Sequence, residues 1–188
     1  MYNGTPTEVE EKLRSCQVES IGVAAKYFRS RSSGSCLISL PTVAVKSGVI
    51  CCLSQFSKYK NILIVTYRRA VCDQLYKQIR GDCITKLTDS GKSKSLTIKD
   101  VHNDINKESS SGIFCTTFQK LLKINSDEIN KICDEFELII IDEGHSEPSP
   151  EWGGIIRKFK AKKIIVTATP YRNDLFSFDI DTDHSYIY

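Results

Sequence analysis

Five apolar runs of strand length divide the chain, and they constrain its fold more than any other feature. Each run is continuous rather than alternating, as expected for strands buried on both faces of a parallel sheet. Between the runs, apolar residues recur with a helical period, as in the stretches 13–28 and 71–79. This alternation predicts an α/β fold: a doubly wound, mainly parallel sheet with helices on both faces. The predicted strands are Cys36–Leu40, Ile62–Thr66, Ile113–Thr116, Leu138–Ile141 and Ile164–Thr167.

The length of 188 residues suits one domain, and the 40% hydrophobic and 26% charged residues are typical of a globular protein. We expect a single domain over 1–188, with residues 1–12 as a polar lead-in and 86–111 as a surface loop containing a short β-like stretch. No apolar run approaches the roughly 20 residues that cross a bilayer, and the acidic N-terminus is not a secretory signal. We therefore expect no membrane partner. The net charge of +3 neither demands nor excludes nucleic acid.

Eight cysteines lie within apolar stretches, and none has C-x-x-C spacing. The three histidines do not cluster with them, which argues against zinc. A buried free thiol behaves as a small hydrophobic group. We expect all eight cysteines to be reduced and the protein to be cytoplasmic.

The segment "ELIIIDEGHSE", residues 137–147, carries the most chemical information. Four apolar residues bring Asp142 and Glu143 to the carboxyl end of a buried strand, where open α/β sheets bind ligands. One carboxylate there can hold a divalent metal, and its neighbour can orient and deprotonate an attacking water. Taken alone, the segment could equally be an acidic loop after a strand.

Several short motifs in the right order resemble those of superfamily 2 helicases and translocases, specifically the first of their two RecA-like domains, a P-loop NTPase fold. "DEGH" resembles motif II of the DEAD/DEAH type, and its glycine variant is similar to the helicase-like subunits of restriction and related DNA-processing systems. The matches cover nearly the whole chain, and their order makes them specific. They are "LRSCQ" (13–17, glutamine motif), "LPTVAVKS" (40–47, motif I), "ILIVTYRRAVCDQL" (62–75, motif Ia), "IFCTTFQKL" (113–121, motif Ib), "DEGH" (142–145, motif II) and "VTATPYRND" (166–174, motif III).

The resemblance implies a site for ATP and Mg²⁺. Lys46 would neutralise the β- and γ-phosphates, while Ser47 and Asp142 would hold the metal. Glu143 would activate water, and His145 would link the ATP site to motif III. The remaining residues that the resemblance assigns are Gln17 for adenine, Thr167 and Thr169 for coupling, and Pro41, Thr42, Val43, Ala44 and Val45 for the phosphate loop.

The resemblance also implies a nucleic-acid partner, with DNA favoured over RNA, gripped through sequence-independent phosphate contacts. Trp152 could stack on a base, but a lone Trp beside two glycines is more often an anchor for a loop, so it is left out of the site. Tyr67 stands where the family usually has proline. The residues aligned with the nucleic-acid contacts are Arg68, Arg69, Thr116, Thr117 and Gln119.

Val43 and Val45 depart from the family's phosphate loop, which has glycine at both places. A phosphate nest needs glycine-type backbone angles and no Cβ near the anion. A β-branched residue forced into them costs about 1–3 kcal/mol per position, so two such positions could weaken binding by roughly a thousandfold. Glu143, Asp142 and Lys46 nevertheless match their family positions.

The resulting interpretation is a DNA-dependent, Mg²⁺-dependent ATPase domain of a superfamily 2 helicase or translocase. The alternative is a catalytically impaired pseudo-ATPase that serves as a nucleic-acid- or protein-binding module. A small P-loop kinase would also use a Lys-Ser loop, but "DEGH" and "TATP" make it the weakest of the three. Since no motif IV–VI segment follows Tyr188, we expect the motor to need a second RecA-like domain or the rest of a larger helicase.

Overall fold

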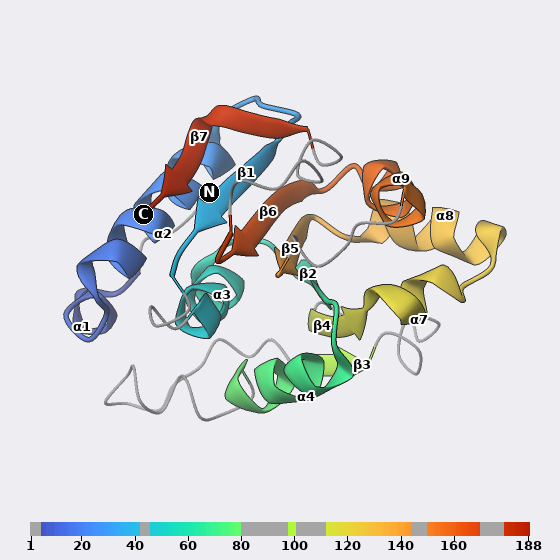
Figure 1. Ribbon diagram of the computed structural model, residues 1–188, viewed down its shortest axis with the longest axis horizontal. Helices are drawn as coiled ribbons and strands as arrows, with labels where there is room; N and C mark the ends of the chain where they lie inside the picture. The colour runs from blue at the N-terminus through green and yellow to red at the C-terminus, as the bar shows by residue number, and fades with distance from the viewer. Residues whose placement is uncertain (1–4, 42–45, 80–97, 101–111, 144–149, 170–178) are drawn as a thin grey trace.

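The computed structural model describes residues 5–41, 46–79, 98–100, 112–143, 150–169 and 179–188. Within them, seven strands form one sheet in the order β3-β4-β2-β5-β6-β1-β7, and each described pair is parallel (Figure 1). The strands are β1 (Ser35–Ser39), β2 (Asn61–Thr66), β3 (Ile98–Asp100), β4 (Gly112–Thr117), β5 (Leu138–Asp142), β6 (Lys162–Thr167) and β7 (Ile180–Ile187).

Helices cover both faces of this sheet. Two separate apolar clusters show this, one shared by α2, α3 and α4 with one face, and the other shared by α7, α8 and α9 with the opposite face. The predicted doubly wound α/β fold is therefore confirmed. The helices are α1 (Thr7–Glu10), α2 (Ser15–Arg29), α3 (Lys46–Phe56), α4 (Arg69–Lys77), α7 (Phe118–Leu122), α8 (Ser126–Glu135) and α9 (Pro150–Lys158).

All five predicted strands are present, with ends that differ by at most two residues from the predicted ones. They are the central strands of the sheet, and the burial of their side chains on both faces explains the continuous apolar runs. The β-like stretch predicted within residues 86–111 corresponds to β3, at one edge of the sheet.

Strand β7 was not predicted, because its sequence lacks the apolar run that marked the others. It lies at the other edge, pairs with β1 alone among the described strands, and has half-buried and exposed side chains but no fully buried one. Its register against β1 is interrupted between Cys36 and Ile38. The N-terminal segment also differs from a purely polar lead-in, since α1 lies within it and buries Val9 completely.

Thiols contribute to the core, as the sequence indicated. Of the seven cysteines that the structure describes, six are buried and Cys72 is half-buried, and none of the seven forms a disulfide. Burial raises the pKa of the Cys36 thiol to about 12, which keeps it protonated and unreactive at neutral pH.

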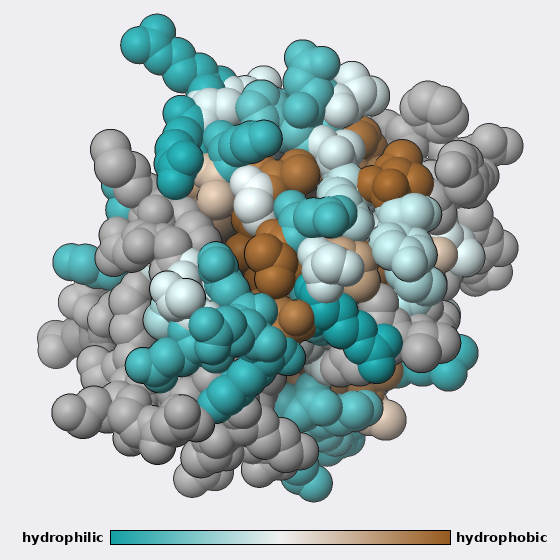
Figure 2. Space-filling model, turned by 90° about the vertical axis from the view of Figure 1, so that its left-hand side faces the viewer, coloured by the Kyte–Doolittle hydropathy of each residue, from teal (hydrophilic) through white to brown (hydrophobic). Residues whose placement is uncertain are grey.

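The side of the molecule that carries α1, α2 and the end of β7 is mainly hydrophilic, with apolar surface in a short band between polar side chains (Figure 2). Among the described helices, none is both long and apolar enough to cross a membrane.

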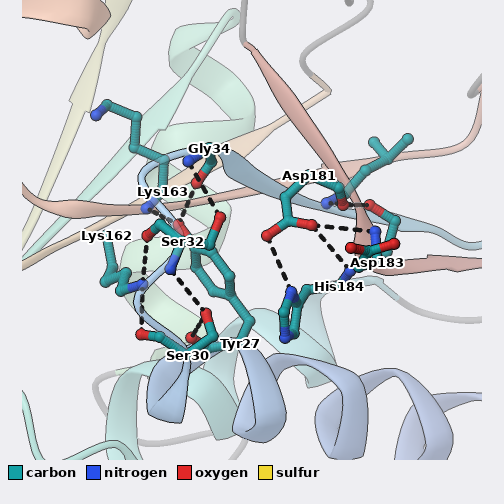
Figure 3. Close-up of polar contacts among 11 residues, drawn as sticks. Tyr27, Ser30, Ser32, Gly34, Lys162, Lys163, Asp181, Asp183 and His184 are labelled. Carbon is teal, nitrogen blue, oxygen red and sulfur yellow. Dashed lines mark hydrogen bonds and ion pairs between the residues drawn. The ribbon is translucent and has the colours of Figure 1, made fainter.

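A polar network joins the amino ends of β1 and β6 to β7 (Figure 3). The Tyr27 hydroxyl donates to the Gly34 carbonyl at 2.6 Å and accepts from the Lys163 amide at 3.1 Å. The Lys162 ammonium donates to the Ser30 and Ser32 carbonyls at 3.1 and 2.6 Å. These contacts satisfy backbone groups of the α2–β1 connection that no sheet partner reaches.

Asp181, in β7, completes this network. Its carboxylate accepts from the backbone amides of Asp183 and His184 and lies 2.9 Å from the His184 Nδ1. The Ser32 hydroxyl bond, followed by His184, holds the pKa of Asp181 below its usual range. The last strand is thereby fastened to the start of the first strand.

Candidate active site

Three neighbouring strands bring the predicted nucleotide motifs to one edge of the sheet. The strands β5, β6 and β1 are adjacent, and parallel pairing places all their carboxyl ends together. The Leu40 amide donates to the Thr167 carbonyl at 2.9 Å, which joins the end of β1 to the end of β6. The motif I, II and III segments therefore begin side by side, although more than a hundred residues separate the first from the last.

The two acids follow directly from β5. Asp142 is its last residue and is only 5% exposed. Glu143 has a left-handed backbone, with φ of 54°, and its amide donates to the Val166 carbonyl at 2.9 Å. A non-glycine residue in this region carries strain, of the order of 1–3 kcal/mol, and such strain is concentrated at functional sites. The chain thus turns sharply at the point where the two adjacent carboxylates emerge.

Lys46 meets these acids from the first residue of α3. Its side chain is 9% exposed, and its ammonium forms an ion pair with the Glu143 carboxylate. A buried ammonium is costly unless it is paired, and a lysine at a helix start is further disfavoured by the helix dipole. The Glu143 partner offsets both costs. The structure thus brings together the lysine of motif I and the acids of motif II.

The electrostatics of Asp142 differ from those of a surface carboxylate. Burial, with the adjacent Glu143 charge second, raises its pKa to about 6, although Lys46 acts in the opposite direction. A buried acid beside another acid has high affinity for a cation, and oxygen ligands are those that Mg²⁺ prefers. Ser47, half-buried in the first turn of α3, could supply a hydroxyl oxygen to the same ion. This donor set fits Mg²⁺.

Gln17 belongs to the first turn of α2, and its side chain faces α3. It is 5% exposed, and its Oε1 accepts from the Arg14 amide at 2.9 Å at the start of α2. A Cβ built on Gly48 would lie 3.0 Å from the Gln17 Nε2, so the amide packs against the first turn of α3. Its assignment to adenine remains a prediction, and Gln17 also has a structural role as part of the cap of α2.

Thr167 is fully buried at the end of β6, and its hydroxyl accepts from the Thr169 amide at 3.2 Å. Thr169 itself is exposed, as is Pro41 at the start of the phosphate loop. Thr167 thus shapes the turn after β6. The coupling roles of both threonines remain predictions. The predicted residues Thr42, Val43, Ala44, Val45 and His145 lie outside the described residues.

The residues aligned with nucleic-acid contacts divide into two groups. Arg68, Arg69 and Gln119 are exposed at the ends of β2 and β4. Thr116 and Thr117 are 1% and 5% exposed, and the Thr117 hydroxyl accepts from the Lys120 amide as the N-cap of α7. The three exposed side chains can reach a phosphate directly. Any direct contact by the two threonines would require their hydroxyls to become accessible.

Trp152 has ring partners that the sequence did not indicate. It lies parallel to Phe118, with ring centroids 4.8 Å apart and planes 8° apart, and 5.2 Å from the Tyr67 ring. The interpretation of Trp152 as a packing anchor agrees with these contacts. Its partners could not be identified from sequence, because the three rings lie on separate elements.

These observations define a class: a RecA-like domain of the superfamily 2 helicase type. Residues 10–172 match the family model described as "Type III restriction enzyme, res subunit", and the chain belongs to this family. Among solved structures, it is similar to the UvsW helicase from bacteriophage T4, with a TM-score of 0.62 and 15% identity over 89% of this chain and 59% of that chain.

It is also similar to a DEAD box protein from the hyperthermophile Methanococcus jannaschii, with a TM-score of 0.62 and 15% identity over 95% of this chain and 53% of that one. The chain thus spans less than two thirds of either protein. No curated protein matches it significantly.

Proposed function

We propose that this chain is the ATP-binding and Mg²⁺-dependent ATPase domain of a superfamily 2 helicase or translocase that acts on DNA. The observation that carries the proposal is the contact of buried Lys46 with Glu143, beside buried Asp142. A lysine, a metal-binding acid and a general base in one cluster are the groups that phosphoryl transfer to water requires.

The Lys46–Glu143 ion pair suggests how the site prepares for its substrate. In the structure, each side chain neutralises the other. When the triphosphate occupies the first turn of α3, Lys46 exchanges the carboxylate for the β- and γ-phosphate oxygens. Glu143 is then released to accept a proton from water.

In the reaction, the oxygen of that water attacks the γ-phosphorus in line, and the bond from phosphorus to the bridging oxygen of ADP breaks. Glu143 accepts the water proton, and Lys46 stabilises charge on the phosphate oxygens. Asp142 and Ser47 would hold Mg²⁺, which when bound neutralises charge shared by the β- and γ-phosphates. The exposed Arg68, Arg69 and Gln119 would bind phosphates of DNA, sequence-independently.

Calorimetric titration with Mg-ATP tests this function. We expect the unchanged chain to bind in the micromolar range and Lys46→Ala to lose most of that affinity. A Val43→Gly/Val45→Gly double variant measures the effect of the two valines. If the double variant binds Mg-ATP and the unchanged chain does not, the result would favour the pseudo-ATPase, a module that keeps the fold but no longer binds nucleotide. Binding by neither protein would contradict the nucleotide site.

Arg68 and Arg69 provide a separate test of the DNA partner. A double change to alanine should weaken oligonucleotide binding and lower the slope of log affinity against log salt by about one for each phosphate that is no longer bound. Exposed Lys131, in α8, supplies a matched control, because Lys131→Ala removes a positive charge outside the predicted DNA-binding motifs. Equal effects of both changes would contradict a specific DNA-binding edge.

A further inference from the structure

Three rings form what we call the aromatic bracket: Tyr67, Phe118 and Trp152. Trp152 stacks on Phe118 at 4.8 Å with nearly parallel planes, and lies 5.2 Å from Tyr67 with planes 51° apart. Both separations fall within the range at which aromatic pairs attract each other beyond simple burial. Trp152 is thus held to both rings at once.

The bracket joins three segments that meet at the carboxyl edge. Thr66 pairs with Thr117 across β2 and β4, so Tyr67 and Phe118 are the residues that immediately follow paired strand ends. Trp152 belongs to α9, the next described helix after the acids. Ile156 of α9 and Ile141 of β5 belong to the same apolar cluster, so α9 shares a core with the strand that carries Asp142.

The two contacts of Trp152 differ in rigidity. Phe118 is 3% exposed and belongs to the core cluster that includes Ile156 of α9. Tyr67 is half-buried, and the residues after it, Arg68 and Arg69, are exposed at the start of α4. A phosphate bound by these arginines would therefore act next to the less constrained contact of the bracket.

Register also places this contact close to the acids. Strand β2 lies directly beside β5, with Val65 paired to Ile141. One residue further along each strand stand Thr66 and Asp142, and the next residues are Tyr67 and Glu143. If Tyr67 moves, the movement therefore occurs at the end of β2, next to the end of β5 that carries the acid pair.

We propose that Trp152 is a positioning residue that couples DNA at Arg68 and Arg69 to the acid pair, through the aromatic bracket and helix α9. The inference rests on the function proposed above and adds the residues through which its two sites communicate. Coupling of this kind is a reciprocal free energy: whatever DNA does to nucleotide affinity, nucleotide does to DNA affinity.

A direct stacking platform for a nucleobase is the competing role for the half-buried Trp152 indole. Here one face of the indole already stacks on Phe118, and the Tyr67 ring contacts it as well. These contacts favour positioning over base stacking. The two roles also predict different losses on mutation, because a platform contributes to DNA affinity itself, whereas a positioning residue contributes to the coupling.

The decisive measurement is the dissociation constant of Mg-ATP with and without saturating oligothymidylate, on this chain and its variants. We expect oligothymidylate to change nucleotide affinity by about fivefold or more. Trp152→Leu should bring the ratio of the two Mg-ATP dissociation constants to within about twofold of one. The affinity for each ligand alone should stay within about threefold of that of the unaltered chain. Trp152→Phe, which keeps a flat ring, should retain most of the ratio. Ile155→Val, on the same helix but without a described ring contact, is the matched control and should retain it fully.

Trp152 is the only tryptophan of the chain, so its fluorescence supplies a second readout on the unaltered protein. We expect oligothymidylate alone and Mg-ATP alone each to shift its emission. This measurement keeps the proposal testable if Trp152→Leu fails to fold.

The outcomes separate the bracket from the proposed function. Suppose that both ligands bind and Trp152→Leu preserves the ratio, or that the unaltered chain shows no coupling. The proposed coupling through the aromatic bracket is then wrong, and the ATPase assignment stands. A tenfold loss of oligothymidylate affinity with the ratio preserved identifies a base platform instead. An unchanged Trp152 emission with both ligands bound also overturns the bracket. If Mg-ATP does not bind, the function fails and the bracket fails with it.

Discussion

The two ends of the same sheet treat carboxylates in opposite ways. At the amino end, hydrogen bonds lower the pKa of Asp181, and the neighbouring Lys162 ammonium donates to two carbonyls although burial lowers its pKa. At the carboxyl end, Asp142 is buried beside a second acid, and its pKa is raised to about 6. The first arrangement stabilises the fold, whereas the second leaves a site that a cation would stabilise.

Hydrogen bonding also differs between the two ends, since the Tyr27 hydroxyl at the amino end satisfies one carbonyl and one amide. Left-handed backbone occurs at both ends, at Asp179 just before β7 and at Glu143 just after β5, and aspartate tolerates this conformation more readily than glutamate. In a parallel sheet, ligands bind beyond the carboxyl ends of the strands. The amino end is therefore free to be optimised for stability, and substitutions at the two ends should have separable effects.

The largest effect is expected from Glu143→Gln, which removes the proposed general base and retains the shape of the side chain. Hydrolysis should fall about 10²- to 10⁴-fold. The melting temperature should fall as well, because buried Lys46 loses the carboxylate that neutralises it. A phosphate-release assay under single-turnover conditions measures the rate. Asp181→Asn neutralises an acid at the other end and serves as the control, which should leave the rate unchanged. Equal losses in both variants would contradict the division between the two ends.

Asp142→Asn should stabilise the metal-free protein at neutral pH. The native pKa of Asp142, about 6, exceeds the unfolded value of 3.8, so the native state binds the extra proton and its stability falls as pH rises through this interval. Removing the charge should raise the free energy of unfolding by about 3 kcal/mol at pH 7 and should leave it unchanged below about pH 4. Urea unfolding in EDTA at several pH values measures this.

Asp181→Asn should show the reverse pattern in the same experiment. Because the native pKa of Asp181 is lowered, its charge contributes stability above the unfolded pKa and loses that contribution as pH falls through the native value. The variant should be less stable than the unaltered protein at neutral pH, and the difference should close in acid. If both substitutions changed the free energy of unfolding in the same direction at neutral pH, the contrast between the two ends of the sheet would be contradicted.

Tyr27→Phe should lower the free energy of unfolding by about 1–2 kcal/mol, because it leaves the partly buried Gly34 carbonyl and Lys163 amide without the hydroxyl. Nucleotide affinity should not change. Thermal or urea unfolding measures the loss, and Tyr186→Phe is the matched control, since its hydroxyl has an exposed bond to Glu19. An equal loss in the control would mean that the amino-end network contributes nothing specific.

The smallest effect is expected from Lys162→Met, which keeps the aliphatic stem and removes the ammonium. The change removes two hydrogen bonds to carbonyls and a cation 4.4 Å from the centre of the Tyr27 ring, with an expected cost of about 1 kcal/mol. Lys163→Met is the control, because the Lys163 ammonium has one long hydrogen bond, 3.4 Å, to the Ala161 carbonyl. Urea unfolding of both variants should separate them, and no difference would remove Lys162 from the network.

The central strands and the acid pair could be predicted because their signal is local. Buried strands such as Leu138–Asp142 must be apolar throughout, and acids directly after such a strand must emerge at its carboxyl end. Strand β7 has no such signal, because an edge strand leaves its side chains partly or fully exposed and tolerates charge. Helix α1 lacks a strong apolar pattern for a similar reason, because Val9 is the one buried residue of this helix.

The order of apolar runs and short motifs in this chain was sufficient to determine a doubly wound α/β domain and to predict which residues form its nucleotide site. Only the tertiary structure decided that Lys46 pairs with Glu143, that Thr117 caps a helix, and that Trp152 rests on two other rings. Local patterns record whether a side chain is buried and on which element. Which distant groups share that burial depends on strand order and register, because these bring together segments that the sequence keeps apart.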